Sequence, residues 1–368
     1  MGRDPPGHGE RKDPVTSIED ITPEYLSAAL GRPVTAVETE PVGVGVGLIG
    51  QLHRITPTYG DGATGPVAVI VKLPGATEES RFVAMVLQMY EKECGFYRDL
   101  AAGSGVTSPG SHHVTFDPET HDFVLMLDDV GQHRQADQIA GIELDDAEIA
   151  IRELAKLNAA WWEHPELRNS AFLRPMDEAP FPEAVAMSFD ASWENALERY
   201  GHLMSPEIQA FGARYAGLFR WFSERLAEGP VTMSHGDWRG DNLFFTGDPE
   251  MPLIAVDWQL IAIAKGIKDF AYFVTQSLRP TDRAAHERRL LQLWLDELAA
   301  NGVQGYEFDE AWEDYRLAVA WAFCYPVIAS STLDASDERG AALALSMIGR
   351  SIAAINELNA LDLVPESV

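Results

Sequence analysis

The chain has 368 residues, of which 28 are Lys or Arg and 57 are Asp or Glu, so its formal net charge is −29. Such an excess of acid repels nucleic acid and anionic membrane surfaces, and neither is an expected partner. The length suits two lobes with separate cores, and the hydrophobic fraction of 46% is that of a globular protein.

The two cysteines, Cys94 and Cys324, lie far apart and lack the spacing of a metal site. This pattern predicts two buried thiols in a reducing compartment, so we expect a cytoplasmic protein. The first residues carry charges throughout and lack the apolar core of a signal peptide. No uncharged apolar stretch reaches the roughly 18 residues of a transmembrane helix, so no membrane span is expected.

The N-terminal part of the chain predicts a tail, a short helix and a first strand. Residues 1–16 are rich in proline, glycine and charge, which predicts a disordered tail. Thr22 can cap a helix whose first residue is Pro23, and this helix is expected to end at residues 31–33. Residues 34–42 alternate weakly between apolar and polar side chains and indicate a strand.

A glycine-rich turn, residues 43–50, separates this strand from a second one at residues 52–55. Such a hairpin can cover the phosphates of a nucleotide, because glycines let backbone N–H groups approach phosphate oxygens. Gly45 and Gly47 are the candidates for this contact. The turn alone is weak support, since most such turns are ordinary hairpins. It lacks the Lys-Ser/Thr ending of a Walker motif and opens no helix, which disfavours a dinucleotide-binding fold.

Lys72 is the one charge in the apolar strand predicted at residues 67–74. A lone lysine near a strand end is usually a surface residue. Here it follows the glycine-rich hairpin, where kinases place the lysine that binds the α- and β-phosphates. Residues 78–100 repeat apolar side chains every three or four positions and predict one long helix. Of the two glutamates in its middle, Glu91 and Glu93, we expect Glu93 to pair with Lys72.

Residues 114–116 and 123–127 predict a second hairpin, after which the sequence turns from apolar to acidic. In a kinase this position is the crossing from the small lobe to the large lobe. We therefore expect backbone groups of Met126, Leu127 and Asp128 to hydrogen-bond the adenine ring of the nucleotide. The assignment rests on position in the chain, because a backbone contact leaves no side-chain signature.

From about residue 143 onward the pattern is helical. The apolar stripe over residues 147–162 is expected to face the core. Residues 164–185 are rich in proline and predict an irregular insertion beside the cleft. Further helices are predicted at about residues 207–227, 266–278, 282–300, 308–329 and 339–361.

Three polar residues on a short strand–loop–strand segment can carry chemistry: Asp237, Asn242 and Asp257. A kinase needs a carboxylate that orients the acceptor hydroxyl and takes its proton, which is the expected role of Asp237. Asn242 and Asp257 offer the oxygen ligands that Mg²⁺ prefers beside substrate phosphates. Such residues are also common turn formers, so each one alone is ambiguous. Hairpin, lysine, helix glutamate and these three residues rarely arise together by chance.

The neighbours of these residues have supporting roles in this interpretation. His235 is expected to brace the loop rather than to act as a base, as the equivalent His or Tyr does in kinases. Trp258 and Gln259 replace the Phe-Gly that follows the metal-binding aspartate of protein kinases. Without that glycine a flipping segment is not expected, and the site is predicted to be preformed.

The sequence resembles the aminoglycoside phosphotransferase and choline kinase superfamily, and within it the ecdysteroid-kinase-like group. The resemblance rests on residues 234–242, 256–259 and 266–273. It implies a bilobal protein-kinase-like α+β fold, ATP, Mg²⁺ and transfer to a hydroxyl group. It also implies that Asp269 braces the catalytic region. One departure is Asn158, where relatives usually carry a histidine, and it concerns local bracing only.

The same resemblance divides the chain into three parts. Residues 1–16 form the tail, residues 17–128 a β-rich N-lobe with one long helix, and residues 129–368 a mostly helical C-lobe. The N-lobe is expected to bind the nucleotide, and the C-lobe to hold the catalytic loop, the metal site and the acceptor.

The acceptor is expected against the C-terminal helices, where the resemblance is weakest. Aromatic residues there, such as Trp321 and Tyr325, are more often core than pocket at helical spacing. Trp238 and Trp258 adjoin the catalytic residues and, if they face the cleft, favour an apolar or ring-bearing alcohol. An aminoglycoside phosphotransferase is the alternative, although the C-terminal part lacks the dense acidic wall that such a cationic acceptor would require.

Two functions of other classes stay open. A metal-dependent phosphohydrolase could use His235 with the three polar residues, but such enzymes usually recruit further histidines in short motifs. The other is a nucleotide-binding module without catalysis, against which the intact set of Lys72, Asp237, Asn242 and Asp257 argues. The favoured function is an ATP-dependent kinase of a small-molecule alcohol.

Overall fold

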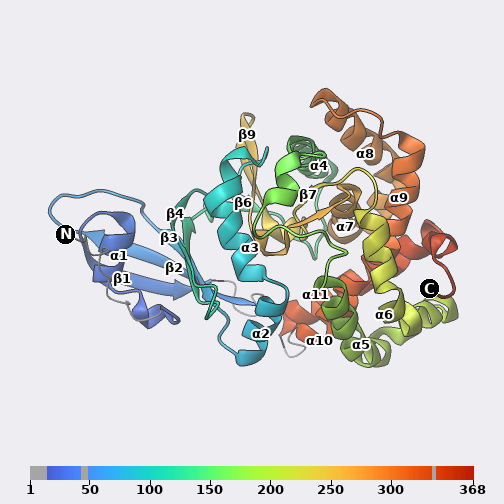
Figure 1. Ribbon diagram of the computed structural model, residues 1–368, viewed down its shortest axis with the longest axis horizontal. Coiled ribbons are helices and arrows are strands. Elements are labelled where there is room, and N and C mark those ends of the chain that lie inside the picture. Colours follow the sequence, from blue (N-terminus) through green and yellow to red (C-terminus); the bar gives the residue numbers. More distant parts are fainter. Residues whose placement is uncertain (1–14, 43–48, 334–336) are drawn as a thin grey trace, which may run out of the picture.

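The structure is a computed structural model that describes residues 15–42, 49–333 and 337–368. Most of the predicted tail and the two glycines Gly45 and Gly47 lie outside the described residues. Figure 1 shows a β-rich part toward the N-terminal end and a larger helical part toward the C-terminal end. The predicted fold class, a bilobal α+β arrangement, is therefore confirmed.

The N-lobe is built on one five-stranded antiparallel sheet with the strand order β1-β2-β3-β5-β4. Apolar side chains from β2, β3 and β5 pack with Leu26 of the first helix into a small core of their own. The strands are β1 (Val34–Pro41), β2 (Gly50–Tyr59), β3 (Val69–Pro74), β4 (Ser111–Phe116) and β5 (Phe123–Asp128).

The first helix, α1 (Pro23–Leu30), begins as the sequence predicts. The Thr22 hydroxyl accepts a hydrogen bond from the backbone N–H of Tyr25 at 3.2 Å. The proline at the first helical position has no N–H to leave unpaired. Gly31 ends the helix in the left-handed conformation, with a φ of 65°.

The single helix predicted over residues 78–100 is wrong, because the chain forms two helices and a π-helical turn there. Helix α2 (Glu78–Val86) ends before Gln88, which adopts the left-handed conformation with a φ of 55°. Helix α3 (Met89–Gly95) follows and continues into the turn Phe96–Leu100. Apolar residues continue to recur every three or four positions on both sides of Gln88. The sequence pattern therefore gives no sign of the break.

The C-lobe is mainly helical, but its first part differs from the prediction. Helix α5 (Phe181–Tyr200) starts within the segment that was expected to be irregular. Pro182 stands in its first turn, where a missing N–H costs nothing. No helix in the described part of the chain is long and apolar enough to span a membrane.

The helix predicted over residues 308–329 is also wrong, because two helices replace it. Pro326 cannot donate the N–H that a continuous helix would need at this position. The helices of the C-lobe other than α5 are α4 (Leu144–Ala160), α6 (Pro206–Ala227), α7 (Ile267–Ser277), α8 (Pro280–Ala300), α9 (Phe308–Trp321), α10 (Cys324–Thr332) and α11 (Glu338–Glu357).

Two small sheets in the C-lobe carry the polar residues that the sequence singles out. β7 pairs antiparallel with β10, and the loop with Asp237 starts where β7 ends. β8 and β9 form a hairpin, with Asn242 just before β8 and Asp257 just after β9, so both residues lie at the same end of it. The strands are β6 (Arg134–Gln135), β7 (Thr232–Ser234), β8 (Leu243–Asp248), β9 (Met251–Ala255) and β10 (Ala262–Ala264).

Helix α3 lies between the sheet and the helical lobe (Figure 1) and packs against the segment that follows β9. Phe96, next after α3, stacks on Trp258, with ring centroids 3.8 Å apart and ring planes inclined by 7°. Both side chains are fully buried. The end of α3 in the N-lobe is thus joined by an apolar contact to the segment that follows β9 in the C-lobe.

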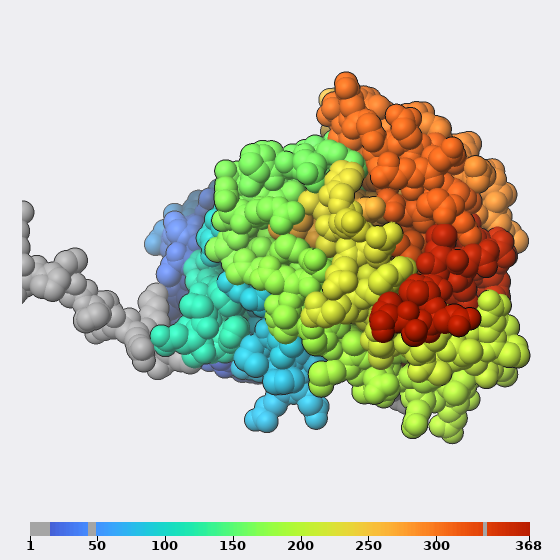
Figure 2. Space-filling view, turned by 45° about the vertical axis from the view of Figure 1, so that its right-hand side comes forward, coloured from blue at the N-terminus to red at the C-terminus, as the bar shows by residue number. Residues whose placement is uncertain are grey.

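The C-terminal residues lie on the side of the helical lobe that is remote from the sheet. Figure 2 shows these residues, in red, against the yellow-green residues of α6. Arg214 of α6 donates a hydrogen bond to the carbonyl oxygen of Pro365. The end of the chain is therefore held away from the site between the lobes.

Replacing Phe96 with alanine should lower the free energy of unfolding by about 3–5 kcal/mol, because a buried aromatic ring is lost and a cavity remains. Urea-induced unfolding of the purified protein measures the change. The matched control is Phe82→Ala on α2, since Phe82 is 61% exposed, and it should cost less than about 0.5 kcal/mol. Equal losses in the two variants would contradict a major role for the stack.

Candidate active site

The carboxylate of Asp269, in the first turn of α7, holds the start of the loop at residues 234–242, which carries the predicted base Asp237. It accepts hydrogen bonds from the Ser234 hydroxyl at 2.9 Å, the His235 N–H at 2.6 Å and the Gly236 N–H at 3.0 Å. Asp269 is fully buried, so these donors replace water around its charge. The contacts are those of the brace that the resemblance implies.

Gly236 gives this loop its shape. Its φ of +85° lies in the left-handed region, and a Cβ atom here would stand 2.1 Å from the carbonyl oxygen of Leu260. Only glycine fits both the conformation and the space. The Gly236 carbonyl oxygen accepts a hydrogen bond from the Tyr325 hydroxyl at 2.6 Å, which ties the loop to α10.

His235 supports the loop and is not placed as a base. Its ring Nδ1 accepts a hydrogen bond from the backbone N–H of Asp237 at 3.2 Å. The ring centroid lies 4.5 Å from that of Trp258 and 5.4 Å from that of Trp238. Burial lowers the pKa of His235, so the ring is neutral at pH 7. These contacts agree with the bracing role expected from the sequence.

Asp237 is the carboxylate at the centre of the site, and its side chain is 12% exposed. Arg239 donates from Nε to the two carboxylate oxygens, at 3.1 and 3.2 Å. Asn242 donates from Nδ2 to one of them at 2.8 Å. Both donors belong to the same loop, so the loop itself fixes the orientation of the carboxylate.

Arg239 is a site residue that was not predicted from the sequence. Its Nη1 atom also donates to Oε1 of Gln138 at 2.7 Å and to Oδ2 of Asp241 at 3.2 Å. A basic residue two positions after the predicted base was the signal that could have revealed it. The guanidinium is an always-charged donor next to Asp237, suited to contact an anionic group.

Asn242 and Asp257 are brought together by the β8–β9 hairpin. The N–H of Val256 donates to the carbonyl oxygen of Asn242 at 3.0 Å, which places Asp257 next to Asn242. The amide nitrogen of Asn242 is engaged with Asp237, so the amide oxygen is the group left to act as a ligand. An amide oxygen and a neighbouring carboxylate fit Mg²⁺, which takes one or two side-chain ligands together with phosphates and water.

Lys72 connects Glu93 and Asp257, and thereby the two lobes. Its Nζ atom lies 2.6 Å from Oε1 of Glu93 and 3.0 Å from Oδ1 of Asp257. The expected choice of Glu93 over Glu91 as its partner is confirmed. Burial disfavours the charge on Lys72, but the two carboxylates outweigh this effect and raise the Lys72 pKa. Lys72 is therefore a cation at neutral pH.

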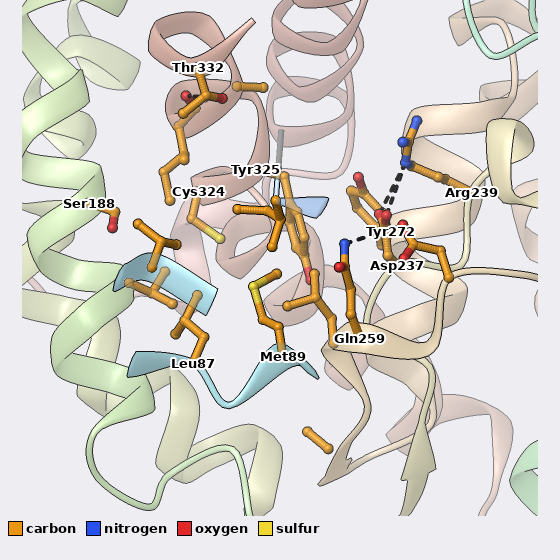
Figure 3. Close-up of a pocket in the computed structure, with 18 of the residues that line it drawn as sticks. Leu87, Met89, Ser188, Asp237, Arg239, Gln259, Tyr272, Cys324, Tyr325 and Thr332 are labelled. Atoms are coloured by element: carbon orange, nitrogen blue, oxygen red, sulfur yellow. Dashed lines mark hydrogen bonds and ion pairs between the residues drawn. The ribbon is translucent and has the colours of Figure 1, made fainter. Parts of the chain in front are cut away.

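A cavity of about 340 Å³ opens beside these residues, between the lobes. Figure 3 shows Asp237 and Arg239 on one side of it and Leu87, Ser188 and Cys324 on the other. Among the described residues that line it, Asp237 and Asp257 are the only acidic ones. Most of the wall is apolar and includes Val83, Leu87, Phe181, Val185, Ile328 and Met347.

The two tryptophans next to the catalytic residues do not face this cavity, so they give no support to a ring-bearing acceptor. Trp238 and Trp258 are fully buried, and their rings pack on His235 and on Phe96. Trp321 and Tyr325, for which a core position was favoured, also line the cavity, and Trp321 is a buried core residue at the same time. A helix periodicity shows which face turns inward, and it does not show whether that face meets a core or a pocket.

The predicted adenine contacts stay a prediction. Met126 and Leu127 lie in β5, with β3 on one side and β4 on the other, so sheet pairing occupies their backbone groups. The N–H of Asp128 donates to the carbonyl oxygen of Gly110 at 2.8 Å. An adenine contact by these three residues would need backbone groups that the sheet does not use.

Known proteins share both sequence features and fold with this chain. A model of the ecdysteroid kinase-like family matches residues 45–303. The chain belongs to this family. A search of curated proteins finds no match.

Solved structures of small-molecule kinases resemble this ecdysteroid kinase-like protein in fold. The GDP complex of aminoglycoside 2′-phosphotransferase-IIIa is 14% identical, with a TM-score of 0.53, and the match covers 90% of this chain and 97% of that one. The Plasmodium vivax ethanolamine kinase is 10% identical, with a TM-score of 0.51, and the match covers 93% and 84%. At these identities the likeness shows the fold alone.

In this ecdysteroid kinase-like protein, Asn158 of α4 takes part in the bracing of β7. Its backbone oxygen accepts a hydrogen bond from the Thr232 hydroxyl at 2.7 Å. Its side-chain oxygen accepts one from the indole N–H of Trp294 at 3.2 Å. The asparagine that departs from the family pattern therefore still connects β7 with the helices behind it.

Lys92 on α3 is a second buried lysine. Within the described part of the chain, its side-chain ammonium has no ion-pair or hydrogen-bond partner. It is 4% exposed, and its Nζ atom stands 5.8 Å from the centroid of the Phe181 ring. Burial, followed by the positive charges of Lys268 and Arg174, lowers its pKa to about 8, and Glu91 opposes this only in part. A buried ammonium without a partner destabilises the fold while it is charged.

Replacing Gly236 with alanine should abolish activity, because the methyl group meets a backbone carbonyl and the left-handed conformation becomes strained. Turnover and thermal unfolding of the variant measure the effect. Gly247→Ala is the matched control: Gly247, near the end of β8, has a φ of +79°, and a methyl group there would meet no atom within 4 Å. It should cost only about 1 kcal/mol and keep turnover. Full activity of Gly236→Ala would refute the steric argument.

The Lys92→Met variant should be more stable than the wild type at pH 7, by up to about 3 kcal/mol. The Lys92 pKa of about 8 lies below the ordinary value of 10.5, so the cost of its charge is complete below pH 8. This cost should disappear as the pH rises from 8 toward 10.5. Chemical unfolding at a series of pH values measures the difference.

The control for this pH series is Lys265→Met. Lys265 pairs with Asp314 at 2.8 Å, so the loss of its charge should destabilise the protein. The stability difference between Lys92→Met and the wild type should depend on pH. If it does not, the lowered pKa of Lys92 and the destabilising effect of its charge are contradicted.

Proposed function

We propose that this protein transfers the γ-phosphoryl group of ATP to a hydroxyl group of a small apolar alcohol. The observation that carries the proposal is the position of Lys72. It contacts Glu93 and Asp257 in the same cavity that Asp237 lines, so a phosphate-binding cation, a metal ligand and a base converge on one space. Membership in the ecdysteroid kinase-like family supports the same chemistry.

The nucleotide would occupy the part of the cavity next to β2 and β3, where Lys72 can bind phosphate oxygens. Asn242 and Asp257 would hold Mg²⁺, which neutralises negative charge on the phosphates when it is bound. The adenine contacts assigned to residues 126–128, and the phosphate contacts of Gly45 and Gly47, belong to this proposal.

Asp237 would orient the acceptor hydroxyl and take its proton while the hydroxyl oxygen attacks the γ-phosphorus. The new bond joins the acceptor oxygen to phosphorus, and the bond to the oxygen that bridges the β- and γ-phosphates breaks, so ADP leaves. Arg239 stands beside Asp237 and would compensate the charge that develops on the transferred group. The same loop would then supply both the base, Asp237, and the compensating positive charge, Arg239.

The wall of the cavity favours an apolar acceptor. Its only described acidic residues are the two aspartates that the proposed reaction requires, and its cations are Lys72, Arg239 and Lys268. The rest of the described lining holds apolar side chains and a few neutral hydrogen-bonding groups, such as Ser188, Thr332 and Tyr272. Ethanolamine and aminoglycosides, which the names of the structural relatives indicate, carry amines that would need further acidic partners. The aminoglycoside alternative is therefore disfavoured.

The Asp237→Asn variant should bind nucleotide like the wild type and lose turnover by roughly 10²–10⁴-fold, because it keeps the shape of the side chain and removes the base. ADP formation with a panel of apolar alcohols measures turnover, and calorimetry measures nucleotide binding. Asp248→Asn, at the exposed end of β8, is the matched control and should keep full activity. Undiminished turnover in Asp237→Asn would contradict the proposed role of Asp237 as the base.

A further inference from the structure

The wall of the cavity opposite the nucleotide side contains a buried cation. Lys268 of α7 lines the cavity and is 2% exposed. Its Nζ atom donates to the Ser234 hydroxyl oxygen at 2.9 Å and to Oδ1 of Asp269 at 3.3 Å. The ammonium also lies 4.9 Å from the ring centroid of Trp321. An ammonium has three N–H groups, so these contacts leave capacity for one more acceptor.

Lys92 approaches the same region from α3. A hollow of about 10 Å³, enough for one water molecule, is lined by Lys92 and Arg174 and borders the main cavity. Leu87, Phe181 and Ala262 line both spaces, so the hollow beside Lys92 adjoins the main cavity. Lys92 is 4% exposed as a residue and lines this hollow, so a space for one water molecule lies next to its side chain.

Lys92 and Arg174 line the hollow, and Lys268 of the main cavity adds positive charge nearby, although Lys268 pairs with Asp269 at 3.3 Å. Glu91 lies on the same helix as Lys92 and forms no ion pair with it. Glu178 also lines the hollow, and it is half exposed and lies 3.7 Å from Arg174. Within the described residues, no carboxylate pairs with the Lys92 ammonium. An apolar side chain at position 92 would avoid the free-energy cost of a buried, unpaired charge.

We propose that the acceptor carries a carboxylate, which binds at Lys92 and Lys268 while the acceptor hydroxyl reaches Asp237. The substrate class is then a hydroxylated apolar carboxylic acid. This inference rests on the proposed function for the position of the hydroxyl. An anion at this place would give Lys92 the partner that it lacks and would satisfy the remaining donor of Lys268.

The size of the hollow favours a carboxylate over a bulkier anion. A space for one water accepts one carboxylate oxygen, whereas a phosphate or sulfate group carries three or more oxygens around its centre. The main cavity of about 340 Å³ accommodates the apolar body of such an acid. In this arrangement the carboxylate of the acceptor binds at Lys92 and Lys268, and its hydroxyl group reaches Asp237.

The first experiment compares hydroxy acids with their methyl esters. The probes are straight-chain ω-hydroxy acids of eight to sixteen carbons and ring-bearing hydroxy acids, each paired with its ester. The full-length wild type should bind the acids at least about tenfold more tightly than the esters in calorimetry, and kcat/KM should follow the same order. Equal affinity for acid and ester in every pair that binds would overturn the proposal.

The variants Lys92→Met and Lys268→Met test the two cations separately. Each should reduce the preference for acid over ester by about tenfold or more. In Lys92→Met the loss should appear in KM rather than in kcat. Lys268→Met also removes the donor to Ser234 and Asp269, so it should lower kcat for acids and esters alike. Lys265→Met is the control: this lysine pairs with Asp314 away from the cavity, so the preference should be unchanged. Lys92→Arg keeps the charge and should keep part of the preference. A preference that persists in both methionine variants would overturn the assignment.

The outcomes separate this inference from the proposed function. Binding of acids that depends on Lys92, without phosphorylation of any probe, would support the carboxylate site and contradict the kinase. Phosphorylation that depends on Asp237, with no preference for acids, would support the kinase and contradict the carboxylate site.

Discussion

The ammonium group of Lys72 lies between two carboxylates that come from different lobes, and the geometry of the whole site depends on this contact. Charges withdrawn from water are costly unless each finds a partner of opposite sign. Here the two carboxylates of Glu93 and Asp257 share one ammonium, and burial raises the pKa of Glu93. The contact that joins the lobes thus also holds Asp257, one of the two ligands proposed for Mg²⁺.

Much of the fold could be predicted because local signals agree with the tertiary structure. The cap of α1 depends on Thr22 and Pro23 alone. The apolar run of β3 indicates a strand buried on both faces, and the structure buries nearly all of its residues. The break at Gln88 could not be predicted, since no glycine or proline marks it and the apolar spacing continues through it. Helix α5 was missed because its prolines, which normally interrupt helices, stand at its first turn.

The candidate site was predictable where residue type and order in the chain determine the chemistry. Asp237, Asn242 and Asp257 meet because a hairpin returns one end of the segment to the other. Side-chain direction was not predictable. Trp258 could equally face the cleft or Phe96, and only the packing of α3 on this segment decides between them. Arg239 was missed for a related reason, because a charged residue in a polar loop carries no periodic signal.

Helix α3 has a further consequence that follows from its place between the lobes. Adjacent residues on a helix point about 100° apart, so Glu93 faces Lys72 while Lys92 faces Phe181. One helix therefore contacts Lys72 on one face and Phe181, which lines the same cavity, on another. Under the proposed function these are the phosphate side and the acceptor side of the cavity. Nucleotide and acceptor binding would then be coupled through one helix, with a coupling free energy of the same size in both directions.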